Sequence, residues 1–98
     1  MRILIVEDEK KVAAFIKKGL EEETYAVDIA SDGEEGLHLG EQNPYDLIIL
    51  DLMLPKINGL DILSGLRSQK IDTPILLLTA KDSVEDNYRI RPGDSQTI

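Results

Sequence analysis

A short apolar run between two aspartates constrains the fold of this chain more than any other feature. Residues 45–51 read Tyr-Asp-Leu-Ile-Ile-Leu-Asp, with four consecutive large aliphatic residues at 47–50. Pro44 precedes the run and Pro55 follows it, so turn signals stand on both sides. An unbroken apolar run of this length is typical of a strand buried on both faces. We therefore predict a central parallel strand that ends at Asp51.

The remaining elements alternate between strand-like and helical patterns. We expect strands at 2–6, 25–30, 45–51 and 75–79, with helices at about 9–22, 34–42 and 60–68. The strand over 25–30 alternates apolar and polar residues, as an edge strand does. Strictly alternating strands and helices indicate an α/β fold, a parallel sheet with helices on both faces. Gly36 and Gly40 lie inside the second helix and predict that it is weak.

Composition narrows the class of protein. The chain has 98 residues, which suits one domain, and its formal charge of −8 argues that this segment does not itself grip a nucleic-acid backbone. It has no cysteine, and no apolar run long enough to cross a membrane. Met1-Arg2 leads directly into the first strand, so we expect no secretory signal. A cytoplasmic domain with a largely solvated acidic surface is the expectation.

Acidic residues follow two strands that should be neighbours. Glu7-Asp8 ends the first strand and Asp51 ends the third. In a flavodoxin-like sheet of order 2-1-3-4 these strand ends meet at the switch point, where open α/β sheets bind ligands. Taken alone, Asp51 is equally compatible with a helix cap or a solvated strand end. Together, three carboxylates should have raised pKa values unless a cation lies among them. A hard ion such as Mg²⁺ suits these oxygen ligands, whereas zinc would favour His or Cys.

Two further residues are weaker candidates. Thr79 ends the fourth strand on the same rim, where its hydroxyl could hydrogen-bond an anion held at Asp51. Threonine is also simply a good strand residue, and for Thr79 alone we favour that interpretation. His38 is expected to be a surface residue of the second helix.

The motifs as a set resemble a known family. They are Ile3-Leu-Ile-Val-Glu-Asp8, Asp46-Leu-Ile-Ile-Leu-Asp51, Leu52-Met-Leu-Pro55, Asn58-Gly59 and Pro74-Ile-Leu-Leu-Leu-Thr-Ala80. Over about residues 1–86 the chain resembles the receiver domain of bacterial two-component response regulators. It looks most like the transcription-factor subfamily that carries a winged-helix DNA-binding effector domain. The implied fold is flavodoxin-like (CheY-like), doubly wound and here incomplete at the C-terminal end.

The resemblance implies a role for each matching residue. Asp51 is the implied phosphoacceptor, and a histidine kinase is the implied donor of the phosphoryl group. Asp8 and Asp51 would supply carboxylates to Mg²⁺, with Glu7 acting directly or through water and the backbone carbonyl of Met53 as a third protein ligand. Thr79 would be the switch hydroxyl that moves toward the phosphate. Family members catalyse their own phosphorylation and dephosphorylation and are not conventional enzymes.

The end of the chain departs from the family pattern. Receivers continue with a fourth helix, a fifth strand ending in Lys-Pro and a fifth helix, and this chain is too short for all three. One interpretation divides it into a receiver core at 1–86 and an atypical tail at 87–98. The other aligns 86–92 with the fifth strand, so that Tyr88 is the aromatic switch residue and Arg91 replaces the phosphate-binding lysine. We favour truncation, because residues 81–87 are too few for a parallel crossover.

These departures leave a second function class open. Without the lysine, the chain could be a binding or dimerisation module that no longer signals. A haloacid-dehalogenase-type hydrolase is disfavoured, because Asp51-Leu-Met53 lacks the second aspartate of that motif. Without its own fifth strand, the fourth strand would be an exposed edge. We therefore expect a homodimer or a domain-swapped assembly that uses this side of the sheet, with residues 87–91 pairing with a neighbouring chain.

Overall fold

The computed structural model describes residues 1–78 and 95–97, which form one parallel sheet and three helices. The strands are β1 (Arg2–Val6), β2 (Ala26–Ala30), β3 (Leu47–Asp51), β4 (Ile75–Leu78) and β5 (Ser95–Thr97). The helices are α1 (Lys10–Glu22), α2 (Gly33–Gln42) and α3 (Gly59–Ser68). The first four strands and the three helices lie where the sequence predicts them. No helix in the described part of the chain is long and apolar enough to cross a membrane.

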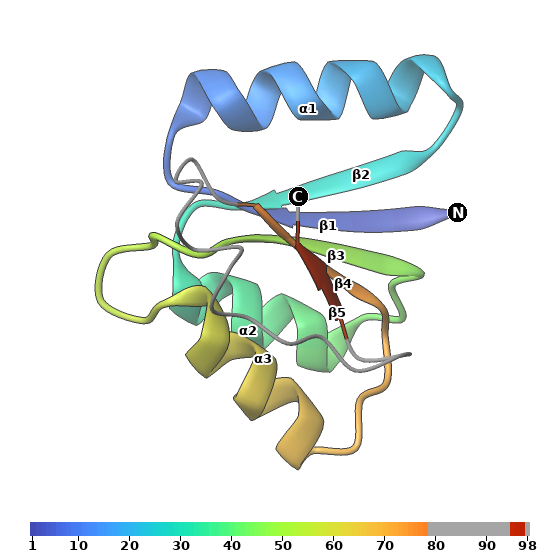
Figure 1. Ribbon diagram of the computed structural model, residues 1–98. Helices are drawn as coiled ribbons and strands as arrows, with labels where there is room; N and C mark the ends of the chain where they lie inside the picture. The colour runs from blue at the N-terminus through green and yellow to red at the C-terminus, as the bar shows by residue number, and fades with distance from the viewer. Residues whose placement is uncertain (79–94, 98) are drawn as a thin grey trace.

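The strands pair in the order β2-β1-β3-β4-β5, and every pair is parallel. α1 covers one face of the sheet, while α2 and α3 cover the other (Figure 1). The predicted flavodoxin-like architecture is therefore confirmed, with β2 at one edge. β1 and β3 are neighbours in a register that pairs Val6 with Leu50. This register brings the residues that follow Val6 alongside Asp51.

Burial on both faces explains why β1 and β3 show no alternation of apolar and polar residues. Leu4 and Val6 point into the core under α2 and α3, whereas Ile3 and Ile5 point toward α1. All four side chains are fully buried. Successive strand residues face opposite sides of a sheet, so a strand between two helical layers must be apolar throughout.

The glycines of α2 allow it to pack closely on the sheet. A Cβ atom at Gly36 would lie 2.7 Å from both methyl groups of Val6, and one at Gly40 would lie 3.0 Å from a methyl group of Leu66. The helix begins at the Asp32 cap, whose carboxylate accepts a hydrogen bond from the Glu35 amide at 2.8 Å. Glycine lowers intrinsic helix stability, and here it allows a contact that alanine would obstruct.

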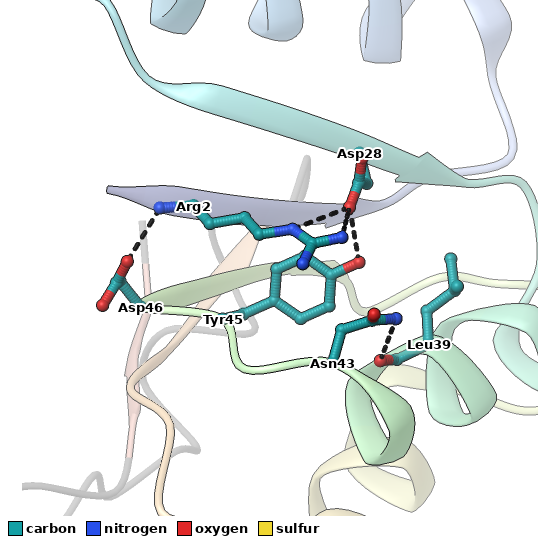
Figure 2. Close-up of polar contacts among 6 residues, drawn as sticks. All are labelled: Arg2, Asp28, Leu39, Asn43, Tyr45 and Asp46. Carbon is teal, nitrogen blue, oxygen red and sulfur yellow. Dashed lines mark hydrogen bonds and ion pairs between the residues drawn. The ribbon is translucent and has the colours of Figure 1, made fainter.

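A polar network ties together the amino ends of three strands (Figure 2). The Arg2 guanidinium donates to Asp28 at 2.9 and 3.2 Å and lies over the ring of Tyr45. The Tyr45 hydroxyl donates to the same carboxylate oxygen at 2.7 Å, while the Arg2 amide donates to Asp46 at 2.7 Å. The Tyr45 hydrogen bond, followed by those of Arg2, lowers the pKa of Asp28, against the opposing effect of burial. The network lies at the end of the sheet opposite the acidic residues.

The expectation that β4 forms a sheet edge is wrong. β5 pairs with β4 within the same chain, with Ile75 opposite Ser95 and Leu77 opposite Thr97. A parallel connection needs about a dozen residues, and residues 79–94 exceed that length, whereas the fifth strand considered from sequence at 87–91 follows β4 too closely. The structure does not describe residues 79–94, so the proposed pairing of 87–91 with a neighbouring chain lies outside the described residues.

Candidate functional site

Three carboxylates meet at the carboxyl ends of β1 and β3. One oxygen from each of Glu7, Asp8 and Asp51 lies within 4.8 Å of the others. Glu7 is buried, Asp51 is half-buried and Asp8 is exposed, so the cluster extends from the core to the surface. The parallel pairing of β1 with β3 produces this convergence, as the sequence predicts.

Glu7 is the electrostatically unusual member of the cluster. Burial, which leaves it only 6% exposed, is the largest cause that raises its pKa, and the charge of Asp51 adds to it. The Glu9 amide donates to Glu7 Oε1 at 3.1 Å and opposes this rise by stabilising the carboxylate. The net effect raises the pKa of Glu7 to about 7. The predicted rise in pKa is therefore found at Glu7.

Backbone contacts fix the position of Asp51. Its Oδ1 accepts a hydrogen bond from the Met53 amide at 2.9 Å, and the Leu52 amide donates to the Leu78 carbonyl at 3.1 Å. Gly59, the first residue of α3, packs directly beneath this turn. A Cβ atom at Gly59 would lie 2.9 Å from the Asp51 carbonyl oxygen. Asn58-Gly59 belongs to the sequence motif that resembles the family, whereas the contact of Gly59 with Asp51 is visible only in the structure.

The carboxylates line one side of an open groove of about 590 Å³. Val12 and Ile16 of α1 line it with Met53 and Leu78. Val12 and Ile16 are site residues that the sequence motifs do not reveal, although their helical spacing directly after Glu7-Asp8 places them above the strand ends. The groove is therefore lined by carboxylates on one side and by apolar side chains on the other.

The other predicted residues have different outcomes. His38 is exposed on α2, as expected. Met53 lies at the groove with its side chain 56% exposed, and the ligand role of its carbonyl stays a prediction. Thr79, Tyr88 and Arg91 lie outside the described residues.

A comparison with known protein families identifies the family of this chain. A family model described as the response regulator receiver domain matches residues 3–91. The chain belongs to this family. The receiver resemblance drawn from the strand-end motifs is thereby confirmed.

Curated relatives of this receiver domain include a transcriptional regulatory protein and a response regulator. The transcriptional regulatory protein CusR of Escherichia coli is 47% identical over 94% of this chain and 45% of its own length. The response regulator ArlR of Staphylococcus epidermidis is 47% identical over 98% of this chain and 48% of its own length. The chain thus spans about half the length of the curated relatives it matches.

The alignment with CusR shows where this chain is shorter than its relative. It extends over 102 positions but includes only 94% of these 98 residues. About ten aligned residues of CusR therefore have no counterpart here. This difference lies inside the matched span, so it favours an internal deletion over simple truncation.

Solved receiver structures share the fold. The Francisella response regulator 1452 receiver domain superposes with a TM-score of 0.83 at 38% identity, covering 98% of this chain and 82% of that one. The response regulator TrrA of Thermotoga maritima, solved in complex with Mg²⁺-BeF, gives a TM-score of 0.85 at 36% identity, covering 99% of this chain and 84% of that one. The C-terminal end of the receiver fold is accordingly incomplete in this chain.

Proposed function

We propose that Asp51 accepts a phosphoryl group from a histidine kinase and thereby carries a two-component signal. A carboxylate oxygen of Asp51 would attack the phosphorus of the kinase phosphohistidine. The phosphorus–nitrogen bond breaks, its electron pair stays on the imidazole, and the product is an aspartyl phosphate. The observation that supports this role best is the position of Asp51, half-buried at the groove and held by the Met53 amide.

We further propose that the acidic cluster binds Mg²⁺. The donors would be Glu7, Asp8, Asp51 and the Met53 carbonyl, an all-oxygen set of the kind that this ion prefers. The raised pKa of Glu7 supports the assignment, because a cation would stabilise the ionised carboxylate. When bound, Mg²⁺ supplies positive charge that neutralises the transferring phosphoryl oxygens. Thr79 and Arg91 stay proposed as the switch hydroxyl and the lysine replacement.

Intact-mass measurement tests the phosphoacceptor. The chain is incubated with Mg²⁺ and a small-molecule phosphodonor, and a gain of one phosphoryl group is expected. Asp51→Asn should abolish the gain, whereas Asp72→Asn, an exposed aspartate at the amino end of β4, should retain it. Equal labelling of Asp51→Asn and the parent chain would contradict the assignment.

Thermal unfolding tests the metal. Added Mg²⁺ should raise the melting temperature through preferential binding to the folded state. Asp8→Asn should lose most of this rise, while Asp72→Asn should keep it. An undiminished rise in Asp8→Asn would place the ion elsewhere.

The alternative function is a binding or dimerisation module that keeps the fold without signalling. The large exposed apolar residues of α1 favour self-association as part of either function. We therefore retain the homodimer as a proposal, although intrachain pairing of β5 removes the reason for strand exchange through β4. If the unsubstituted chain gains no phosphoryl group, the result would favour the binding or dimerisation module.

In the parent protein, the receiver would act in the cytoplasm and regulate a separate DNA-binding effector domain. This part of the proposal rests on the similarity of the chain to transcriptional regulatory proteins such as CusR. The net charge of −8 supports this division of roles, because an acidic segment is repelled by DNA phosphates.

A further inference from the structure

Asn58 caps the start of α3 and is followed directly by Gly59, which makes the one Asn-Gly pair of the chain. The Asn58 side chain is exposed to water. In such a pair the glycine amide nitrogen can attack the asparagine side-chain carbonyl, because glycine has no side chain to obstruct the approach. The other two asparagines are less reactive by this route, since Asn43 precedes a proline, which has no N–H, and Asn87 precedes a tyrosine.

The reacting groups of this pair are held by only two hydrogen bonds among the described residues. Asn58 Oδ1 accepts one from the Asp61 amide at 2.9 Å, which draws electron density away from the side-chain carbonyl carbon. The Gly59 amide donates to the Leu52 carbonyl at 3.4 Å, a long and weak hydrogen bond. Asn58 has a ψ of 168°, so the Asn58–Gly59 peptide must rotate before a ring can close. We therefore expect the reaction to start from a local opening and to be slower than in a short peptide.

We propose that Asn58 is a site of spontaneous deamidation and that its isoaspartate product displaces the turn that carries Asp51. The Gly59 nitrogen forms a bond to Asn58 Cγ, the Cγ–Nδ2 bond breaks, and the proton of the Gly59 amide leaves with the side-chain amine as ammonia. Water then adds to either carbonyl of the cyclic imide and opens it to aspartate or isoaspartate. Water is the only co-reactant.

The two products differ in their effect on the fold. Aspartate keeps the cap and adds a negative charge at the amino end of α3, which the helix dipole stabilises. Isoaspartate instead inserts the side-chain methylene into the main chain immediately before Gly59. This region has no space for it, because even a Cβ atom at Gly59 would lie 2.9 Å from the Asp51 carbonyl oxygen and 3.1 Å from the Leu52 Cα. The longer main chain therefore moves the Asp51 turn or the start of α3.

Ageing of the full chain in mildly alkaline buffer tests the modification. Peptides from samples taken over time are analysed by mass, and enzymatic methylation of isoaspartate is measured in parallel. The Asn58 peptide should gain one mass unit before the Asn43 and Asn87 peptides change. If Asn58 converts no faster than these two residues in the folded chain, the proposal is overturned.

Asn58→Ser is the matched control for the isoaspartate measurement. Serine retains an oxygen that can cap α3 and has no amide to lose. Both proteins keep Asp32-Gly33, the other described pair that can form such an imide, so the difference between them is the isoaspartate formed at Asn58. Equal methylation of the aged parent chain and aged Asn58→Ser contradicts the formation of isoaspartate at this site.

The effect on Asp51 is tested on the aged protein, and this part rests on the phosphoacceptor role proposed above. Ion exchange isolates the deamidated protein, and Asn58→Asp supplies the aspartate product alone. The isoaspartate form should gain its phosphoryl group roughly tenfold more slowly than Asn58→Asp, because small displacements of a reacting group have effects of this size. Equal labelling of the two forms would show that the turn is not displaced.

Hydrogen exchange separates failure of this inference from failure of the phosphoacceptor role. The Met53 amide donates to Asp51 Oδ1, so displacement of the turn should speed its exchange in the isoaspartate form relative to Asn58→Asp. This measurement stays decisive even if no form of the chain is labelled. Unchanged exchange at Met53 overturns the proposed displacement, whereas faster exchange without labelling of any form counts only against the phosphoacceptor.

Discussion

At the scale of single residues, Glu7 connects the site to the stability of the fold. Its pKa of about 7 exceeds the ordinary value of 4.5, chiefly because the carboxyl is buried. The folded state therefore binds the Glu7 proton more tightly than the unfolded state does. Its contribution to stability is fully present below pH 4.5 and is lost as the pH rises through about 7.

We predict that Glu7→Gln removes this pH dependence in the metal-free protein. Glutamine stays neutral, so the variant should be more stable than the parent at pH 8, and the difference should narrow toward pH 5. Urea unfolding in the presence of a chelator measures both curves. Saturating Mg²⁺ should reduce the advantage of the variant, because the ion stabilises the Glu7 carboxylate. Parallel stability curves for variant and parent would count against the raised pKa.

The hydrogen bond between Tyr45 and Asp28 gives a second prediction at this scale. Tyr45→Phe should lower the unfolding free energy by about 1 kcal/mol, the usual net worth of such a bond. The lowered pKa of Asp28 means that its stabilising effect is present above pH 3.8 and is lost as the pH falls below that value. A double-mutant cycle with Asp28→Asn at pH 7 isolates the pair. A coupling energy indistinguishable from zero would show that the contact does not stabilise the fold.

At the scale of elements, the ends of α1 and α3 share one backbone motif. At the end of α1, the Thr24 amide donates to the Glu21 carbonyl, and the Tyr25 amide donates to the Leu20 carbonyl. α3 repeats the pattern at Lys70. Thr24 and Lys70 have φ values of 68° and 62°, in the left-handed region that favours glycine.

We predict that Thr24→Gly stabilises the protein. Relief of the left-handed conformation should outweigh the added freedom of the unfolded chain, with a net gain of roughly 0.5–1 kcal/mol. Thr73→Gly is the matched control, because Thr73 is not among the described residues with positive φ, and it should destabilise. Chemical denaturation of both variants makes the comparison. A loss of stability in Thr24→Gly would mean that the hydrogen bond from the Thr24 hydroxyl to the Glu23 carbonyl, at 2.5 Å, outweighs the relief of the left-handed conformation.

At the scale of the whole molecule, β5 decides whether β4 is a central or an edge strand. Truncation before Ser95 removes the paired strand and leaves the backbone of β4 exposed, so we expect lower stability and concentration-dependent association through the sheet. Light scattering of the truncated and the full-length chain over a dilution series detects this association. A truncated chain that stays monomeric with unchanged unfolding would show that β5 does not protect the edge.

The sequence by itself determined the positions of the first four strands and the three helices and, through the flavodoxin-like order that their alternation suggests, the acidic cluster. Apolar runs and helical spacing are local patterns, and once β1 and β3 are recognised as neighbours, their final residues must meet. Glu7, Asp8 and Asp51 could therefore be assigned to one site before any coordinates were known. The motifs around Asp51 were specific enough to indicate the family.

Tertiary structure alone decided the features that join distant parts of the chain. Arg2, Asp28 and Tyr45 meet across three strands, and Gly59 fits under Asp51, contacts that no local pattern predicts. The position of β5 was predicted wrongly because β-pairing depends on the length of the connection and on the available partner edge, whereas Ser95–Thr97 has little strand character of its own. The burial of Glu7, which sets its pKa, likewise follows from the packing around β1 and not from the identity of the residue.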